Sequence, residues 1–294
     1  MSIPTNNGAR ALTLLILLAL IWGTSFILMK RGLLVFSAGE VGSLRVASAS
    51  LFLLPVAIAN IRGLDRKHYI KLFASGMMGI FFPAFLFAMA QTKMESSVTG
   101  IMNSLTPILT LLIGVSFFHQ KFRKKSIIGI LIGLVGTVIL ILAKSEGRIG
   151  GVNLYALFVI LACLFYAVNL NFIKYKISDL NALTITSVSL MLIGPLAIFF
   201  LFTFTEFNDK ISTVDGAWQA LGFILLLGFM STCLATILFN LLVKITSPLY
   251  TSSVTYLIPI VAVLWGIFDG EQLFAGHFIG MAAIIGGVYL ANRK

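Results

Sequence analysis

The sequence predicts an all-α integral membrane protein built from two related halves, and three observations carry this prediction. Of the 294 residues, 59% are hydrophobic and only 11% are charged, whereas an ordinary water-soluble domain carries roughly 25% charged residues. The apolar residues form runs of about 18 to 25, each long enough to cross a hydrocarbon core of about 30 Å as a helix. A polar, proline-bearing stretch at Ser96–Phe118 returns in altered form at Ser247–Phe268.

Ten membrane helices are expected in chain order. The first apolar run, from Ala11 to Met29, is longer than the apolar part of a signal peptide and no soluble domain follows it, so we interpret it as a membrane helix. Nine further apolar runs are expected to span, at residues 39–60, 69–91, 95–118, 126–143, 154–173, 180–203, 216–243, 246–268 and 275–292.

The positive charges orient these helices. With the N-terminus inside, 14 of the 21 Lys and Arg residues fall in inner loops or termini, six fall in outer loops, and Arg45 lies within a helix. Cytoplasmic loops carry an excess of Lys and Arg, so both termini are predicted to be cytoplasmic. The same loop positions explain the net charge of +11 without a nucleic-acid partner. Cys163 and Cys233 lie in apolar runs and indicate neither a disulfide framework nor a metal site.

The internal repeat sets the expected domain boundaries. Aligning Pro107 with Pro259 matches the fourth and ninth helices, and LIWGTSFILMK in the first helix matches LFYAVNLNFIK in the sixth. We therefore predict a first repeat at residues 1–144, a linker at 145–153 and a second repeat at 154–294. Five helices per half is an odd number, so the second half must enter the membrane from the opposite side, which makes the repeats inverted.

Several segments, in this order, resemble the EamA type of the drug/metabolite transporter superfamily. They are WGTSF in the first helix, SLRVASASLFLLP in the second, the two proline-bearing helices, and DGEQLFAGHFIG before the tenth. The resemblance covers nearly the whole chain. It implies a ten-helix exporter or exchanger of small metabolites with a central cavity between two five-helix halves. One departure is that His119 stands in the first half where the second has Glu271, which weakens any role that needs an acid at that end of both repeats.

One stripe of the first helix and its counterpart in the sixth are candidate walls of this cavity. Trp22, Ser25 and Phe26 fall on one helical face, and Tyr166 and Asn169 occupy the same face of the sixth helix. We predict that these side chains contact substrate. The alternative is that the aromatic rings only pack against neighbouring helices and that Ser25 is a small interface residue.

Polar side chains of four other helices complete the predicted cavity: Gln91, Thr99, Asn103, Asn240, Thr255 and Tyr256. A buried amide has two donors and two acceptor lone pairs to satisfy, which makes Asn103 and Asn240 the strongest hydrogen-bonding candidates. Asn171 lies about 200° around the helix from Asn169, so the two cannot face one cavity. The alternative for these groups is an interhelical hydrogen bond, worth only about 0.6 kcal/mol in a membrane.

Arg45, Pro107 and Pro259 are expected to have structural or gating roles. Arg45 lies near the outer end of its helix, where an ion pair with Glu40 or Glu95 is favoured over substrate binding. Each proline removes a backbone hydrogen bond and frees a carbonyl that neighbours or water must satisfy. No Asp or Glu falls near the middle of a predicted helix, so no proton relay is evident.

These patterns predict a transporter and not an enzyme. The substrates would be small metabolites, amino acids among them, moved by alternating access around a cavity at the membrane midplane. Two alternatives stay open: a lipid-modifying membrane enzyme, for which no nucleophile, metal cluster or paired acids is found, and a receptor or assembly protein that transports nothing. The expected partners are a small-molecule substrate and the lipid bilayer of the cell inner membrane, with a homodimer as an option. No cofactor, metal or nucleic acid is predicted.

Overall fold

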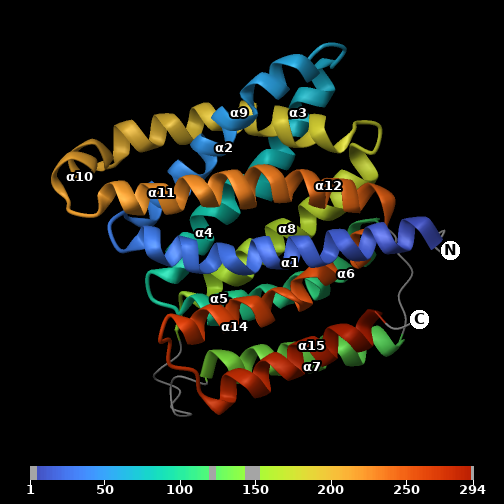
Figure 1. Ribbon diagram of the computed structural model, residues 1–294. Coiled ribbons are helices and arrows are strands. Elements are labelled where there is room, and N and C mark those ends of the chain that lie inside the picture. Colours follow the sequence, from blue (N-terminus) through green and yellow to red (C-terminus); the bar gives the residue numbers. More distant parts are fainter. Residues whose placement is uncertain (1–4, 119–123, 143–152, 293–294) are drawn as a thin grey trace.

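The computed structural model describes residues 5–118, 124–142 and 153–292, and these ranges consist of helices and loops with no β-strand. Figure 1 shows the helices as a bundle, with α1 beginning and α15 ending at the same end of it. Among the described residues, eight helical segments are long and apolar enough to cross a membrane: Ala9–Leu33, Ala38–Asn60, Arg66–Gln91, Ser96–Phe118, Ala156–Lys176, Ala182–Phe204, Ala217–Ile245 and Tyr250–Phe268.

Several of these segments are divided into consecutive elements. In the first half the elements are α1 (Thr5–Leu33), α2 (Ala38–Asn60), α3 (Arg66–Gly76), η1 (Met77–Phe81), α4 (Phe82–Gln91), α5 (Ser96–Met102), η2 (Asn103–Leu105), α6 (Thr106–Phe118) and α7 (Lys124–Leu142). In the second half they are α8 (Ala156–Lys176), α9 (Ala182–Phe204), α10 (Phe207–Thr213), α11 (Ala217–Leu227), η4 (Gly228–Leu234), α12 (Ala235–Ile245), α13 (Pro248–Ser252), η5 (Ser253–Tyr256), α14 (Ile258–Phe268) and α15 (Ala275–Asn292).

The internal breaks fall at corresponding places in the two halves. The segments η1 and η4 are π-helical and interrupt the third and eighth expected helices. The segments η2 and η5 are 3₁₀-helical and interrupt the fourth and ninth. The sequence prediction expected Pro107 and Pro259 to interrupt the hydrogen bonding of the fourth and ninth helices, but it anticipated neither their 3₁₀ geometry nor the two π-helical segments. Departures of this kind inside helices occur often at functional sites and hinges.

Each repeat proline lies in the first turn of the α-helix that comes after a 3₁₀ segment. Pro107 is the second residue of α6 and Pro259 the second residue of α14. At the start of a helix the missing N–H of proline is not needed, and its fixed φ suits the first turn. The prolines therefore begin new helices and do not lie in the interior of continuous ones.

Both carbonyls that the prolines would otherwise leave free are hydrogen-bonded. An α-helix would pair residue 107 with the carbonyl of Asn103, which instead accepts the Thr106 hydroxyl at 2.8 Å. It would pair residue 259 with the carbonyl of Thr255, which accepts the Ser104 hydroxyl at 2.8 Å. The expectation that neighbours satisfy these carbonyls is confirmed, and the second bond joins the two halves.

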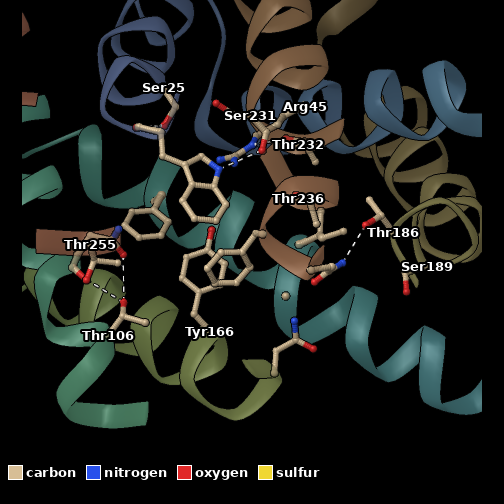
Figure 2. Close-up of a pocket in the computed structure, with 18 of the residues that line it drawn as sticks. Ser25, Arg45, Thr106, Tyr166, Thr186, Ser189, Ser231, Thr232, Thr236 and Thr255 are labelled. Atoms are coloured by element: carbon tan, nitrogen blue, oxygen red, sulfur yellow. Dashed lines mark hydrogen bonds between the residues drawn. The ribbon is translucent and has the colours of Figure 1, made fainter. Parts of the chain in front are cut away.

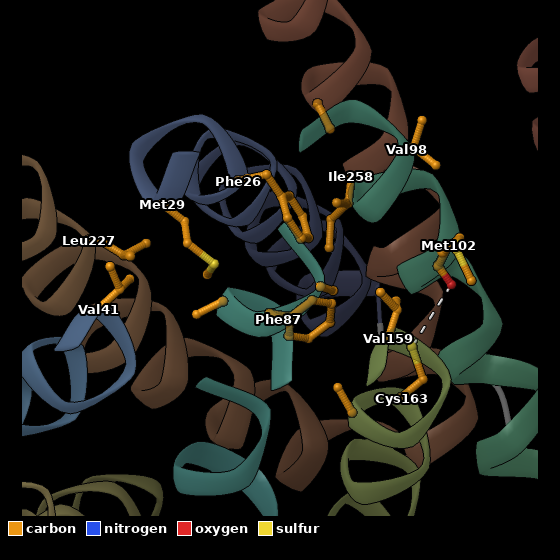
Figure 3. Packing of buried hydrophobic residues seen from close by; sticks show 14 of the residues in the cluster. Phe26, Met29, Val41, Phe87, Val98, Met102, Val159, Cys163, Leu227 and Ile258 are labelled. Atoms are coloured by element: carbon orange, nitrogen blue, oxygen red, sulfur yellow. Dashed lines mark hydrogen bonds between the residues drawn. The ribbon is translucent and has the colours of Figure 1, made fainter. Parts of the chain in front are cut away.

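The largest hydrophobic core crosses between the halves. Figure 3 shows Phe26 of α1, Phe87 of α4 and Ile258 of α14 close together, and Met102 of α5 belongs to the same cluster. These four side chains are at most 4% exposed. Because the core takes residues from both repeats, its packing fixes α1, α4, α5 and α14 around the space that is described below.

The helices α7 and α15 pack against each other along facing glycines (Figure 1). A Cβ placed on Gly287 would lie 2.5 Å from the carbonyl oxygen of Gly129, and one on Gly136 would lie 2.8 Å from Ala283 Cβ. Glycine thus permits a backbone approach that any larger residue would prevent. The homodimer stays a prediction. His119 and most of the expected linker, at 145–152, lie outside the described residues.

Candidate functional site

A partly enclosed cavity lies between the two halves, with about 950 Å³ of empty space when its open side is included. The first half contributes 11 lining residues: Trp22, Ser25, Phe26, Met29, Arg45, Ser75, Gly79, Ile80, Phe87, Asn103 and Thr106. The second half contributes 12: Tyr166, Asn169, Ile185, Thr186, Ser189, Ser231, Thr232, Thr236, Phe239, Asn240, Ser252 and Thr255. Figure 2 shows ten of these residues by name, from several helices, around one space.

The structure brings most of the sequence-predicted site residues to this cavity. Eight of the eleven predicted substrate contacts line it: Trp22, Ser25, Phe26, Asn103, Tyr166, Asn169, Asn240 and Thr255. Arg45, which was predicted to have a structural or gating role, lines it as well. The stripe on the first helix and its repeat on the sixth therefore do face each other across one space.

Gln91, Thr99 and Tyr256 do not line the cavity, so their predicted positions were wrong. The Thr99 hydroxyl returns to the Glu95 carbonyl at 3.0 Å within α5. A 3₁₀ turn rotates about 120° per residue and an α-helix about 100°. The segments η2 and η5 therefore change the direction of side chains that a continuous α-helix would place on one face. Gln91 is buried at the end of α4, where neither its amide nitrogen nor its oxygen has a hydrogen-bond partner among the residues that the structure describes. Tyr256 packs against the main core.

The two π-helical segments supply lining residues that the sequence analysis missed. Gly79 and Ile80 come from η1, and Ser231 and Thr232 come from η4. The Trp22 indole N–H donates to the Ser231 carbonyl at 3.1 Å, so a backbone group of η4 holds a cavity side chain. The repeated pair Gly76 and Gly228, the same 152 residues apart as the prolines, was the available signal in the sequence.

Aromatic rings form one wall of the cavity. Trp22 meets Phe239 edge to face at 4.8 Å between ring centroids. Phe87 lies between Phe26 and Tyr166, at 5.7 Å and 5.9 Å. Ring pairs at these separations hold one another in fixed orientations. The wall is therefore a rigid apolar surface contributed by both halves.

Three amides add hydrogen-bonding groups. The Asn169 oxygen accepts the Ser75 hydroxyl at 2.8 Å, and the Asn240 amide donates to the Thr186 hydroxyl at 2.8 Å. The Asn103 oxygen accepts the Thr106 hydroxyl at 3.3 Å. Within the described ranges, the Asn103 and Asn169 amide nitrogens have no hydrogen-bond partner, which leaves donors for a ligand.

Asn171 lies away from the cavity, as its place on the helix predicts. It is fully buried, and its amide donates to the Thr110 and Ala167 carbonyls, each at 3.0 Å.

Arg45 lies in the cavity wall and not in the expected ion pair. Its Nε donates to the Thr232 hydroxyl at 2.8 Å, and Tyr166 is a further polar neighbour of its guanidinium. Figure 2 shows Arg45 next to Thr232. The two acids expected as partners bind other cations: Glu40 pairs with Lys210 at 2.8 Å, and Glu95 lies 3.7 Å from Lys30. Helix α2 continues past its first turn before Arg45, which places the side chain too deep to meet either acid.

Beyond the cavity, a buried carboxylate joins the end of α1 to the start of α5. Lys30 Nζ lies 2.8 Å from Glu271 Oε1 and 2.7 Å from Asp269 Oδ2. The two Glu271 oxygens also accept the backbone N–H groups of Ser96 and Ser97, each at 3.0 Å, and both serine hydroxyls, each at 2.5 Å. Glu271 thus caps the first turn of α5 from a different element, where the helix dipole also favours negative charge.

The pKa of Glu271 reflects these contacts. Burial by itself would raise the pKa, because it disfavours the charged carboxylate. The hydrogen bonds from Lys30, Ser96 and Ser97 outweigh burial and lower the pKa from its usual 4.5 to about 2. Glu271 is therefore ionised at neutral pH.

At the opposite end of the bundle, Lys174 takes the position that Lys30 has in the first repeat. Its Nζ donates to the carbonyls of Val243 and Thr246, at 3.2 Å and 2.8 Å. It therefore ties α8 to the end of α12 through neutral groups. In the described ranges, no three His, Cys, Asp or Glu side chains come together in a way that could hold a metal ion.

Comparison with known proteins matches the chain over nearly its whole length. The family model described as "EamA-like transporter family" matches twice, at residues 9–142 and 153–293. An uncharacterized transporter of Archaeoglobus fulgidus is 26% identical over 274 residues, covering 93% of this chain and 95% of the relative. The uncharacterized transporter YetK of Bacillus subtilis is 27% identical over 260 residues, covering 85% and 77%.

A solved crystal structure has the same fold. It superposes with a TM-score of 0.67 and covers 97% of this chain and 96% of its own, at 16% sequence identity. At that identity the likeness concerns the fold alone.

Proposed function

We propose, from the premise that this chain belongs to the EamA-like transporter family, that it is a carrier that exports or exchanges small metabolites. The chain is a multi-pass membrane protein, and the part that the structure describes has eight helices able to span a bilayer. The observation that carries the proposal is the cavity between the halves, to which each repeat contributes about half of the lining. A site at the interface of inverted repeats can be exposed to either side when one half rocks against the other.

The cavity residues have separate roles in this proposal. The ring wall around Trp22 and Tyr166 holds the apolar part of the substrate, and the amide donors of Asn103 and Asn169 replace part of its hydration. The broken helices at Pro107 and Pro259 bend as the halves rock. Because most lining groups are neutral, binding is weak enough for release on the other side.

The proposed membrane arrangement completes the architecture. The helices α7 and α15 also span, which gives ten membrane helices in two inverted repeats at residues 1–144 and 154–294. The excess of Lys and Arg in the inner loops supports cytoplasmic termini and a place in the cell inner membrane. No catalytic reaction is needed for this activity.

The test is counterflow in vesicles that contain the purified protein. Labelled amino acids, organic acids, amines and neutral metabolites are offered against the unlabelled compounds inside, with protein-free vesicles as the baseline. Asn103→Ala and Trp22→Ala are expected to lower flux at least tenfold. Thr99→Ala is the matched control, since Thr99 is buried one turn before Asn103 but does not line the cavity.

The outcomes are distinct. Flux that both cavity variants lose and Thr99→Ala keeps supports a carrier with its site in this cavity. Flux that is indifferent to both cavity variants would place the site elsewhere. No flux of any compound would favour the receptor or enzyme alternative.

A further inference from the structure

The starting observation is a buried positive charge in the cavity wall. The Arg45 side chain is 7% exposed, although arginine remains protonated under all ordinary conditions. It is the single charged residue among those that line the cavity in the described part of the chain, and the lining includes no Asp or Glu.

The neighbours of Arg45 do not neutralise it. Thr232 and Tyr166 are neutral, and the hydrogen bond to Thr232 uses one of the five N–H donors of the guanidinium. Within the described ranges, no carboxylate lies within 4.0 Å of it. A buried charge without a counter-ion is costly, and it is normally paired or removed. Arg45 cannot lose its proton, so the missing negative charge has to come from a molecule that enters the cavity.

The shape of the guanidinium narrows the choice of anion. Its planar fork matches the two oxygens of a carboxylate, which it can bind through two parallel hydrogen bonds. One guanidinium balances one negative charge. A dianion such as a phosphate monoester would therefore retain one negative charge that no lining residue neutralises. The inverted-repeat counterpart of Arg45 is Ser189, a neutral hydroxyl that donates to the Leu72 carbonyl. The anion therefore has one place in the cavity and not two.

The absence of lining acids also bears on amino acids. A zwitterion would bring an ammonium group into the cavity, and the described lining offers it only neutral oxygens and ring faces. The complex with Arg45 would then keep a net positive charge. A simple carboxylate would form a neutral complex, with its apolar body against Trp22, Phe87 and Tyr166.

We infer that the substrates are small organic monoanions whose carboxylate binds Arg45 and whose apolar body lies on the aromatic wall. This inference rests on the proposed carrier function and names the substrate class of the same cavity.

The test compares four probes of similar size that differ in charge. They are 3-phenylpropionate, its neutral amide 3-phenylpropionamide, the zwitterion phenylalanine, and phenylalaninamide. Binding to the purified full-length protein is measured as the rise in unfolding temperature with probe concentration, because only ligands that bind the folded state stabilise it. 3-Phenylpropionate is expected to bind at least tenfold more tightly than each of the other three.

Variants at Arg45 separate charge from shape. Arg45→Gln is expected to bring the affinity for 3-phenylpropionate within about twofold of that for its amide, and to leave amide binding near the wild-type level, which also reports a folded cavity. Arg45→Lys keeps the charge without the fork and is expected to restore part of the preference. If Arg45→Gln does not fold, the wild-type comparison of acid with amide still decides.

The results distinguish this inference from the carrier function. Equal binding of acid and amide, tighter binding of phenylalanine, or binding of none of the probes would overturn the monoanion assignment. Counterflow of other compounds would then leave the carrier in place. No counterflow of any compound overturns the carrier itself, whatever the probes bind.

Discussion

The two ends of the bundle are related by the repeat but are closed by different chemistry. At the Lys30 end, which holds Lys30, Glu40, Lys210, Asp269 and Glu271, side-chain ion pairs join the elements. At the Lys174 end, which holds Lys174 and the first turn of α9, Lys174 binds backbone carbonyls, and the side-chain pair of His68 with Asp179 lies at the surface, with Asp179 56% exposed.

A second pair of positions shows the same contrast. Glu40 and Thr184 are each the third residue after the helix caps Ser37 and Asn181. Glu40 pairs with Lys210 at 2.8 Å, whereas the Thr184 hydroxyl donates to the Asn60 side chain at 3.1 Å. The two repeats thus keep contacts at corresponding positions, but the contacts are ionic at the Lys30 end and neutral at these positions of the Lys174 end. In a carrier that opens alternately, the Lys30 end should be the harder one to open.

Glu271→Ala should have the largest effect on this contrast. It removes a carboxylate that is fully buried and that accepts five hydrogen bonds, including the one from Lys30. Breaking a buried pair by removing one partner typically costs about 3 kcal/mol or more. Lys174→Ala at the other end should cost about 1 kcal/mol, because it removes bonds to carbonyls without leaving a buried charge. Thermal unfolding of the purified variants measures both, and equal losses would contradict the contrast.

The same contrast should appear as a difference in acid sensitivity. The pKa of Glu271 is lowered from 4.5 to about 2 in the folded protein. A lowered carboxyl pKa stabilises the fold above the unfolded pKa, and that stability is lost as the pH falls from 4.5 toward 2. At the Lys174 end, the hydrogen bond with His68 lowers the pKa of Asp179. The Asp179 side chain is 56% exposed, however, so solvent screening leaves it a small contribution.

Glu271→Gln should therefore remove most of the loss of unfolding temperature on acidification, and Asp179→Asn should remove little of it. The measurement is the unfolding temperature of each protein against pH in one detergent. A wild-type slope that survives Glu271→Gln would assign the acid sensitivity to another group.

Sequence patterns predicted the parts of this molecule that depend on hydrophobic length and on the repeat. Helical spacing and the alignment of the halves were enough to predict that Trp22 and Tyr166 face each other. The free carbonyl before Pro259 was also predictable, because proline has no N–H to donate to it. The hydroxyl that fills it was not, because Ser104 lies in the other repeat.

The failures have a common cause in local helix geometry. Thr99 and Tyr256 were placed on stripes that hold only for unbroken α-helices, whereas one 3₁₀ segment follows Thr99 and the other includes Tyr256. The π-helical lining from Ser231 and Thr232 was missed because the repeated Gly76 and Gly228 do not by themselves specify an extra residue in a helical turn. The ion pair of Arg45 was expected because Glu40 and Glu95 were placed on the same side of the membrane, but in the structure both acids bind lysines.

Ser104→Ala should have the smallest effect and would sharpen the comparison at the middle of the molecule. It leaves the Thr255 carbonyl, which the hydroxyl reaches across the repeats at 2.8 Å, without that donor. Thr106→Val removes the equivalent donor from the Asn103 carbonyl within one helix. Interhelical hydrogen bonds in membranes average about 0.6 kcal/mol, so each change should lower the unfolding free energy by about that amount. Only Ser104→Ala loosens the contact between the halves, so it should also alter the counterflow rate, whereas Thr106→Val, if it changes the rate, should do so through cavity affinity. If saturating substrate restores the counterflow rate of Ser104→Ala, the hydrogen bond between Ser104 and Thr255 has no part in the transport cycle.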